Sequence, residues 1–189
     1  MKKLVIFGSG AGSNAVNICR YFKNSSDIEV VLICTNNKDA FIVDRAKKLN
    51  IPIVFTSKTD LLRFDDLAKT LKNYAVDYII LAGFLLKIPS KMISSYPNKI
   101  INLHPSLLPK YGGKGMYGSN VHEAVLENKE TETGITIHLV NQNYDEGKII
   151  YQESFNLSPD ENLESLTTKI HELEQSLFPK IIEKTLFSL

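Results

Sequence analysis

Short apolar runs alternate with segments of helical period along the first half of the chain. The runs are nearly continuous and rich in Val, Ile and Leu, which is typical of strands buried on both faces. They lie at Leu4–Phe7, Ile28–Cys34, Ile51–Phe55, Tyr78–Ala82 and Ile100–Leu103. In the first three gaps between these runs, apolar residues recur at helical spacing along one side of a predicted helix. These stripes lie within residues 15–22, 42–49 and 64–71. This succession predicts an α/β fold with a Rossmann-like, doubly wound, mostly parallel sheet and right-handed crossovers.

The last third of the chain follows a different pattern. Between residues 135 and 140, Ile135, Ile137 and Leu139 alternate with Thr136, His138 and Val140, so this strand is expected to have two unlike faces. A turn at Asn141–Gly147 leads to a second strand near Ile149–Phe155. The two strands are expected to form an antiparallel hairpin at the sheet edge.

A long C-terminal helix is predicted by an apolar stripe that begins at Leu163 and ends at Leu177. Its start has two candidates. Ser158–Glu161 resembles a capping box with proline at the first helical position, and Asn162 is a rival cap. Pro179 has no backbone N–H and is expected to kink or end the helix.

Composition narrows the class of protein. The 189 residues are 43% hydrophobic and 23% charged, which suits one globular domain over residues 1–189. A net charge of +1 gives no reason to expect nucleic acid or an anionic membrane as a partner. Cys19 and Cys34 have apolar neighbours and suit free thiols in a reducing compartment. The first apolar run is too short for a signal sequence or a membrane span, so we expect a cytoplasmic protein.

Three unusual segments follow predicted strands. They are Gly8–Asn14, Ala82–Phe84 and Asn102–Pro109. Ligands of open α/β sheets bind at the carboxyl ends of the strands, near the point where the strand order reverses. We therefore expect these segments to converge on one site.

Gly8–Asn14 opens a helix, so its backbone N–H groups and the helix dipole can hold a phosphate, with Ser13 and Asn14 as further donors. A dinucleotide site is a rival interpretation. However, Ser13 stands where G-x-G-x-x-G requires its third glycine, and Thr35–Asn37 offers no acid for a ribose. A glycine-rich turn without a ligand is the other alternative.

Asn102 and His104 lie two apart on a strand, so their side chains leave the same face. An amide donor beside an imidazole suits polarising a carbonyl group and moving a proton. The alternative is a histidine that only satisfies a loop carbonyl. Asp145 precedes Glu146 and Gly147, and taken alone it is typical of a turn.

For the remaining histidines and one acid, the local pattern alone predicts the environment. His138 is expected to pack on the less apolar face of its strand, and His122 and His171 to be surface residues of helices. Glu174 follows the apolar Leu173, so helix geometry alone predicts a solvated side chain.

Four segments together resemble the phosphoribosylglycinamide formyltransferases, a branch of the folate-dependent formyltransferase family. They are Ser9–Asn14, Leu81–Phe84, Asn102–Pro109 and Asp145–Gly147. The resemblance runs nearly end to end in the same order. It implies transfer of a formyl group from 10-formyltetrahydrofolate, a co-substrate, to the amine of 5'-phosphoribosylglycinamide in purine biosynthesis. It implies small-molecule substrates, no metal and no nicotinamide, and leaves the oligomeric state open.

The resemblance also implies roles for individual residues. The catalytic residues are Asn102, His104 and Asp145, and Asp145 is expected to raise the pKa of His104. The acceptor is bound by Gly12, Ser13, Asn14 and Glu174. The folate pocket is formed by Leu85, Leu86, Lys87, Ile88 and Asn102. The segment Gly112–Gly118 is richer in glycine than in many relatives.

Two other functions stay open. One is formyl transfer to a different amine, such as an amino sugar. The other is a non-catalytic phosphate- or nucleotide-binding module of the same fold. The module would need only the glycine-rich turn, whereas the enzyme also needs Asn102, His104 and Asp145.

Overall fold

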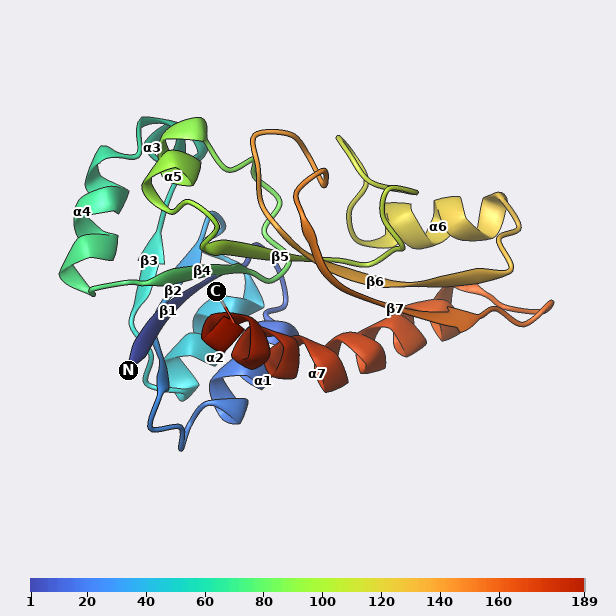
Figure 1. Cartoon of the computed structure of the whole chain (residues 1–189), viewed down its shortest axis with the longest axis horizontal. Coiled ribbons are helices and arrows are strands. Elements are labelled where there is room, and N and C mark those ends of the chain that lie inside the picture. The colour runs from blue at the N-terminus through green and yellow to red at the C-terminus, as the bar shows by residue number, and fades with distance from the viewer. Residues whose placement is uncertain (189) are drawn as a thin grey trace. The chain divides into compact units, whose positions relative to one another are not determined.

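The computed structural model describes residues 1–188, and the chain forms two compact units, Met1–Ile101 and Asn102–Leu189. The first unit contains β1 (Lys2–Phe7), α1 (Ser13–Tyr21), β2 (Ile28–Thr35), α2 (Phe41–Lys48), β3 (Ile53–Phe55), α3 (Lys58–Arg63), α4 (Asp65–Asn73), β4 (Tyr78–Leu81) and α5 (Ser90–Ser95) (Figure 1). Strand β5 (Ile100–His104) begins in the first unit and ends in the second. The second unit continues with α6 (Ser119–Glu127), β6 (Glu132–Leu139), β7 (Ile149–Asn156) and α7 (Leu163–Ser188).

The strands of the first unit follow the order β3-β2-β1-β4, and the start of β5 lies next to β4. The pairs β1–β2, β2–β3 and β1–β4 are parallel. The chain moves outward from β1 to β3 and then crosses back to β4, so right-handed crossovers place α1 and α2 on one face and α4 on the other. The predicted doubly wound, mostly parallel sheet is confirmed.

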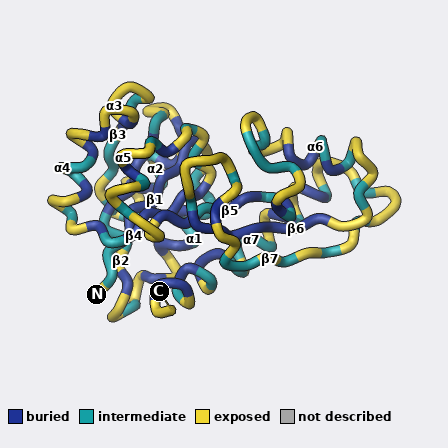
Figure 2. The backbone as a smooth tube through the Cα atoms, turned by 45° about the horizontal axis from the view of Figure 1, so that its top comes forward, coloured by how far each residue is buried: buried dark blue, intermediate teal, exposed yellow. Residues whose placement is uncertain are grey.

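Burial on both faces explains the continuous apolar runs. Residues 4–7 of β1 are each 0% exposed, and Figure 2 shows the buried positions concentrated along the strands. The helical stripes are buried as well, with Ile18, Ile42 and Leu71 in the core. One detail differs from the prediction. Phe64 has a positive φ of 62° and separates α3 from α4 instead of forming part of a helix.

Strands β6 and β7 of the second unit pair antiparallel, as predicted. Their order continues that of β5, as β5-β6-β7. The register shifts between Ile137 and His138, and such a bulge redirects the side chains beside it. Residues 133–139 are all buried, so the polar side chains of Thr136 and His138 need hydrogen-bond partners inside the unit.

Helix α7 packs against α6 and β6. Asn162 is its cap, because its Oδ1 accepts a 3.0 Å hydrogen bond from the Ser165 N–H and its own N–H donates to Ser165 Oγ. Of the two expectations for Pro179, a kink or an end of the helix, the end is wrong, since α7 continues to Ser188. Phe178 and Ile182 are fully buried, and their packing holds the turn that lacks the proline N–H.

Candidate active site

Asn102 and His104 leave the same face of β5, as predicted, and β6 supplies a third side chain beside them. Asn102 Nδ2 lies 3.0 Å from His138 Nε2, and His138 Nδ1 lies 2.9 Å from the Leu139 carbonyl oxygen. His138 therefore carries its proton on Nδ1 and accepts one amide hydrogen from Asn102. This contact fixes the direction of the amide, whose second N–H can donate to a substrate oxygen.

The role of His138 is wider than the packing role expected from its sequence. Its side chain is 2% exposed and contacts both Asn102 and Asp145. The signal in the sequence was the polar face of β6, on which Thr136 and His138 lie together.

His104 is held by the loop that follows β5. Its Nε2 lies 2.8 Å from the carbonyl oxygen of Tyr111, and its Nδ1 lies 3.7 Å from Asp145 Oδ2. Because a carbonyl oxygen only accepts, Nε2 carries the proton. Nδ1 is then the basic nitrogen, and it faces a carboxylate. His104 satisfies a loop carbonyl and also belongs to a polar cluster.

Asp145 lies between the two imidazoles. Its Oδ2 accepts a 2.9 Å hydrogen bond from the Gly113 N–H, and its Oδ1 lies 3.6 Å from His138 Nε2. Burial raises the pKa of Asp145, but the contacts with His138, Gly113 and His104 outweigh burial and hold the pKa below its usual value. Asp145 is therefore a carboxylate at neutral pH.

The pKa of His104 lies below its usual value. Burial lowers it, whereas Asp145 and the Tyr111 carbonyl raise it and His138 lowers it further. Asp145 raises the pKa of His104, as expected, but burial is the larger effect and the net shift is downward. His104 is therefore neutral at pH 7, with a lone pair on Nδ1 that can take up a proton.

Two more ionisable side chains belong to this cluster. His122 on α6 is only 6% exposed, so its assignment to the surface is wrong. Burial lowers the pKa of His122, and Glu174 raises it. Glu174 on α7 also acts on His104, and its side chain is 14% exposed instead of solvated. His171 is exposed, as predicted, and lies 3.8 Å from Glu174.

The glycine-rich turn of the first unit leads into α1. Gly12 is the N-cap of this helix, with φ of 74°, so the N-cap residue has no side chain to bond to the first N–H groups. A Cβ atom on Gly12 would lie 2.6 Å from Ile42 Cγ1, so glycine is required here by conformation and by packing. Ser13 and Asn14 form the first turn of α1 and are partly exposed.

The turn contacts the segment after β4. The Ser9 N–H donates to the Gly83 carbonyl oxygen, and Ser9 Oγ accepts from the Leu85 N–H at 2.9 Å. These two predicted segments therefore meet inside the first unit, as expected.

The segment that is predicted to line the folate pocket is partly exposed. Leu85 is 51% exposed and Lys87 is exposed, while Leu86 is half-buried and Ile88 belongs to the core.

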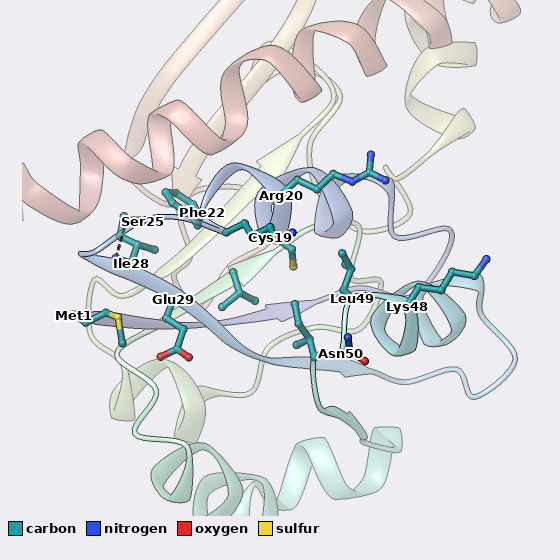
Figure 3. A pocket seen from close by; sticks show the side chains of 13 residues that line it. Met1, Cys19, Arg20, Phe22, Ser25, Ile28, Glu29, Lys48, Leu49 and Asn50 are labelled. Carbon is teal, nitrogen blue, oxygen red and sulfur yellow. Dashed lines mark hydrogen bonds between the residues drawn. The ribbon is translucent and has the colours of Figure 1, made fainter.

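A surface hollow of about 570 Å³ lies elsewhere on the first unit (Figure 3). It is lined by Cys19 and Phe22 at the far end of α1 and by Leu49 after α2. Burial raises the pKa of Cys19 to about 12, so this thiol stays protonated and unreactive at neutral pH. Among residues 1–188, no group of three or more His, Cys, Asp or Glu side chains is placed to hold a metal ion.

The structure is that of an α/β protein in which an amide donor, a neutral imidazole and a carboxylate lie together near the end of a strand. The chain matches the Formyl transferase family over residues 2–182. It belongs to this family.

Three proteins that are named phosphoribosylglycinamide formyltransferase are similar to this chain. It is 37% identical over 187 residues to the chloroplastic phosphoribosylglycinamide formyltransferase of Arabidopsis thaliana, covering 96% of this chain and 64% of that protein. The Vigna unguiculata enzyme is 35% identical, and 60% of it is covered, so the chain spans less than two thirds of both plant relatives. The Haemophilus influenzae enzyme is 34% identical, with 97% of this chain and 86% of that protein covered.

A solved structure has the same fold. The phosphoribosylglycinamide formyltransferase from Bacillus halodurans superimposes with a TM-score of 0.89 at 32% identity, covering 98% of this chain and 95% of that chain. The Rossmann-like sheet with its hairpin and long C-terminal helix is therefore the architecture of this family.

Proposed function

We propose that this protein transfers the formyl group of 10-formyltetrahydrofolate to the amine of 5'-phosphoribosylglycinamide, a step of purine biosynthesis. The observation that carries the proposal is the cluster of Asn102, His104 and Asp145 at the end of β5, in a member of the formyl transferase family. The shared name of the plant and bacterial relatives supports the choice of acceptor. A phosphate-binding module would not require this cluster.

The contacts of the cluster suggest how the residues act. The acceptor amine attacks the formyl carbon, and the second N–H of Asn102 donates to the formyl oxygen as it gains negative charge. Nδ1 of His104 takes the proton that the amine loses, and the resulting cation faces the Asp145 carboxylate. The bond from the formyl carbon to the donor nitrogen then breaks, and His104 returns the proton to that nitrogen. Each step uses a donor, a base or a charge that the cluster supplies.

We further propose binding roles for side chains outside this trio. Gly12, Ser13 and Asn14 bind the phosphate of the acceptor at the start of α1, and Glu174 holds its glycinamide end. On the donor side, the exposed parts of Leu85–Lys87 contact the folate, together with Asn102, and the buried Ile88 supports them from the core.

The test is a formyl-transfer assay with purified protein, 10-formyltetrahydrofolate and several amines in parallel, without added metal or nicotinamide. Transfer to phosphoribosylglycinamide in preference to the other amines is the expected result. Full activity with an amino sugar and none with phosphoribosylglycinamide would replace the acceptor. Phosphate or nucleotide binding without any transfer would favour the non-catalytic module.

Asp145→Asn is expected to move the acid limb of the pH–rate profile to lower pH and to reduce kcat. The base is neutral His104, so activity falls as pH drops through the pKa of His104, which lies below 6.5. Because the Asp145 carboxylate raises this pKa, its loss lowers the pKa further. Asparagine keeps the size of the side chain and an acceptor for Gly113. The pH dependence of kcat, with a thermal melt, decides; an unchanged limb in a folded variant would leave Asp145 as a turn residue.

Ser13→Ala is expected to raise the KM for the acceptor about 10-fold or more and to leave the KM for the folate unchanged, since a hydrogen bond to a charged group contributes roughly 1.5–3 kcal/mol. Changing Gly12 would be less informative, because any side chain there collides with Ile42. The matched control is Ser119→Ala, since Ser119 also follows a glycine N-cap at the start of α6. If the folate KM rises and the acceptor KM does not, the turn has been assigned to the wrong substrate.

The remaining expectations for the protein as a whole are also proposals. The family match includes parts of both units, which supports one formyltransferase domain over residues 1–189, although Leu189 lies outside the described residues.

In the part of the chain that the structure describes, helices that are long and apolar enough to cross a bilayer are absent. We propose a cytoplasmic location because Cys19 and Cys34 are buried free thiols. The two plant relatives are named chloroplastic.

A further inference from the structure

The backbone of one loop, Lys110–Gly113, bonds to both ionisable members of the catalytic trio. The Tyr111 carbonyl oxygen accepts from His104 Nε2 at 2.8 Å, and the Gly113 N–H donates to Asp145 Oδ2 at 2.9 Å. The first of these bonds decides which imidazole nitrogen carries the proton. The position of this loop therefore decides whether Nδ1 of His104 is the base.

The loop does not hold this conformation by local preference. Tyr111 has φ of 55°, which is unfavourable for a residue with a side chain, and Gly113 has φ of 99°. A Cβ atom on Gly112 would lie 2.7 Å from Leu108 Cδ2 and 3.2 Å from Asp145 Cβ, so the loop lies directly against the site. Glycines also follow at positions 113, 115 and 118. Contacts from outside the loop are needed to hold it.

Glu130 provides these contacts. Its Oε1 accepts a 2.8 Å hydrogen bond from Tyr111 Oη, and both of its carboxylate oxygens lie 3.0 Å from Lys110 Nζ. Glu130 is itself fixed at the end of α6, where its N–H donates to the Val125 carbonyl oxygen and Lys129 has a positive φ of 52°. The carboxylate thus ties two consecutive loop residues to the end of a helix.

We propose that Glu130 is a positioning residue for His104, which acts by fixing the backbone of Tyr111 so that its carbonyl oxygen holds Nε2 of the imidazole. The role rests on the proposed function, because it assigns His104 as the base. It also explains how a glycine-rich segment can adjoin a site that needs fixed geometry.

The contact persists over the pH range in which histidine titrates. Burial and the Glu130 carboxylate raise the pKa of Tyr111 to about 12, and the hydrogen bonds from Lys110 and Tyr111 lower the pKa of Glu130. Tyr111 therefore stays a donor and Glu130 an acceptor. The ionisable side chains that act on His104 itself are Asp145, His138 and Glu174, and none of them is changed by a substitution at position 130.

The test is Glu130→Ala in the full chain. The expected result is a kcat about 10- to 100-fold lower with little change in either KM, because a small misplacement of a reacting group has effects of this size. The pKa of His104 should fall, since the Tyr111 carbonyl raises it. An NMR titration of the imidazole signals measures this pKa, and the signal missing in His104→Asn identifies His104 among the 4 histidines.

Three further variants separate positioning from stability. Glu130→Gln keeps an acceptor for Tyr111 Oη and should restore most of the activity and the His104 titration. Tyr111→Phe removes the hydroxyl group and should resemble Glu130→Ala. Glu153→Ala removes a similar carboxylate contact, that with Tyr151 on β7, and should change neither kcat nor the pKa of His104.

The outcomes are distinct. If Glu130→Ala and Tyr111→Phe lower the melting temperature and leave the His104 titration unchanged, Glu130 only stabilises the fold and the proposal is wrong. Should Glu130→Ala fail to fold, the same comparison is made with Tyr111→Phe and Glu130→Gln. Should the wild type show no formyl transfer, the proposed function fails, while the NMR titration still decides whether Glu130 positions the imidazole.

Discussion

His104→Asn is expected to lower kcat by about 10²–10⁴, the usual contribution of a positioned acid–base group. The basic nitrogen of His104, Nδ1, faces the Asp145 carboxylate, whereas the basic nitrogen of His138, Nε2, already accepts a hydrogen from the Asn102 amide. An asparagine oxygen is far too weak a base to take its place. The KM values should change little, since the lost interaction matters after proton transfer begins.

The pH–rate profile gives the sharper measurement. In the wild type the rate falls at acid pH as His104 becomes protonated, and in the variant this limb should disappear. Because His104 is only 4% exposed, circular dichroism and a thermal melt must show that the variant is folded. A folded variant with the wild-type rate and acid limb would remove His104 from the mechanism.

Asn102→Ala is expected to lower kcat by about 10²–10³, the loss measured when one oxyanion donor is removed from an enzyme. The wild-type amide is directed by His138 Nε2 at 3.0 Å, so its second N–H needs no reorganisation when charge develops on the formyl oxygen. Single-turnover rates at saturating substrate measure this loss apart from binding.

A matched control exists in the same unit. Asn128 Nδ2 donates to the Ala124 carbonyl oxygen at 2.8 Å, away from the trio, so Asn128→Ala removes a similar amide without touching the cluster. Its single-turnover rate should match that of the wild type. If Asn102→Ala is as active as Asn128→Ala, the oxygen of the formyl group is stabilised by something other than Asn102.

The strands and most of the helices could be predicted because burial leaves a direct trace in the sequence. A strand covered on both faces must be apolar at nearly every position, as residues 4–7 are. The continuation of α7 through Pro179 left no such trace. It goes with the full burial of Phe178 and Ile182 in a helix that packs against α6 and β6.

The site was predictable only in part, for a similar reason. Asn102 and His104 were predicted as candidate site residues from their place at the end of a strand, which is local information. The contact between His138 and Asn102 depends on the pairing of two different strands and on the bulge beside His138. The alternation of residues along a single strand reveals neither of these features. The burial of His122 depends in the same way on the packing of α6.

Burying His104 and His122 also links folding to proton uptake. Both have folded-state pKa values below 6.5, the value expected in the unfolded chain. Below pH 6.5 the unfolded chain therefore binds more protons than the folded one, so acid shifts the equilibrium toward unfolding. Above 6.5 both states carry neutral imidazoles, and these two residues no longer make stability depend on pH. The groups that make the site basic at neutral pH thus also make the second unit sensitive to mild acid.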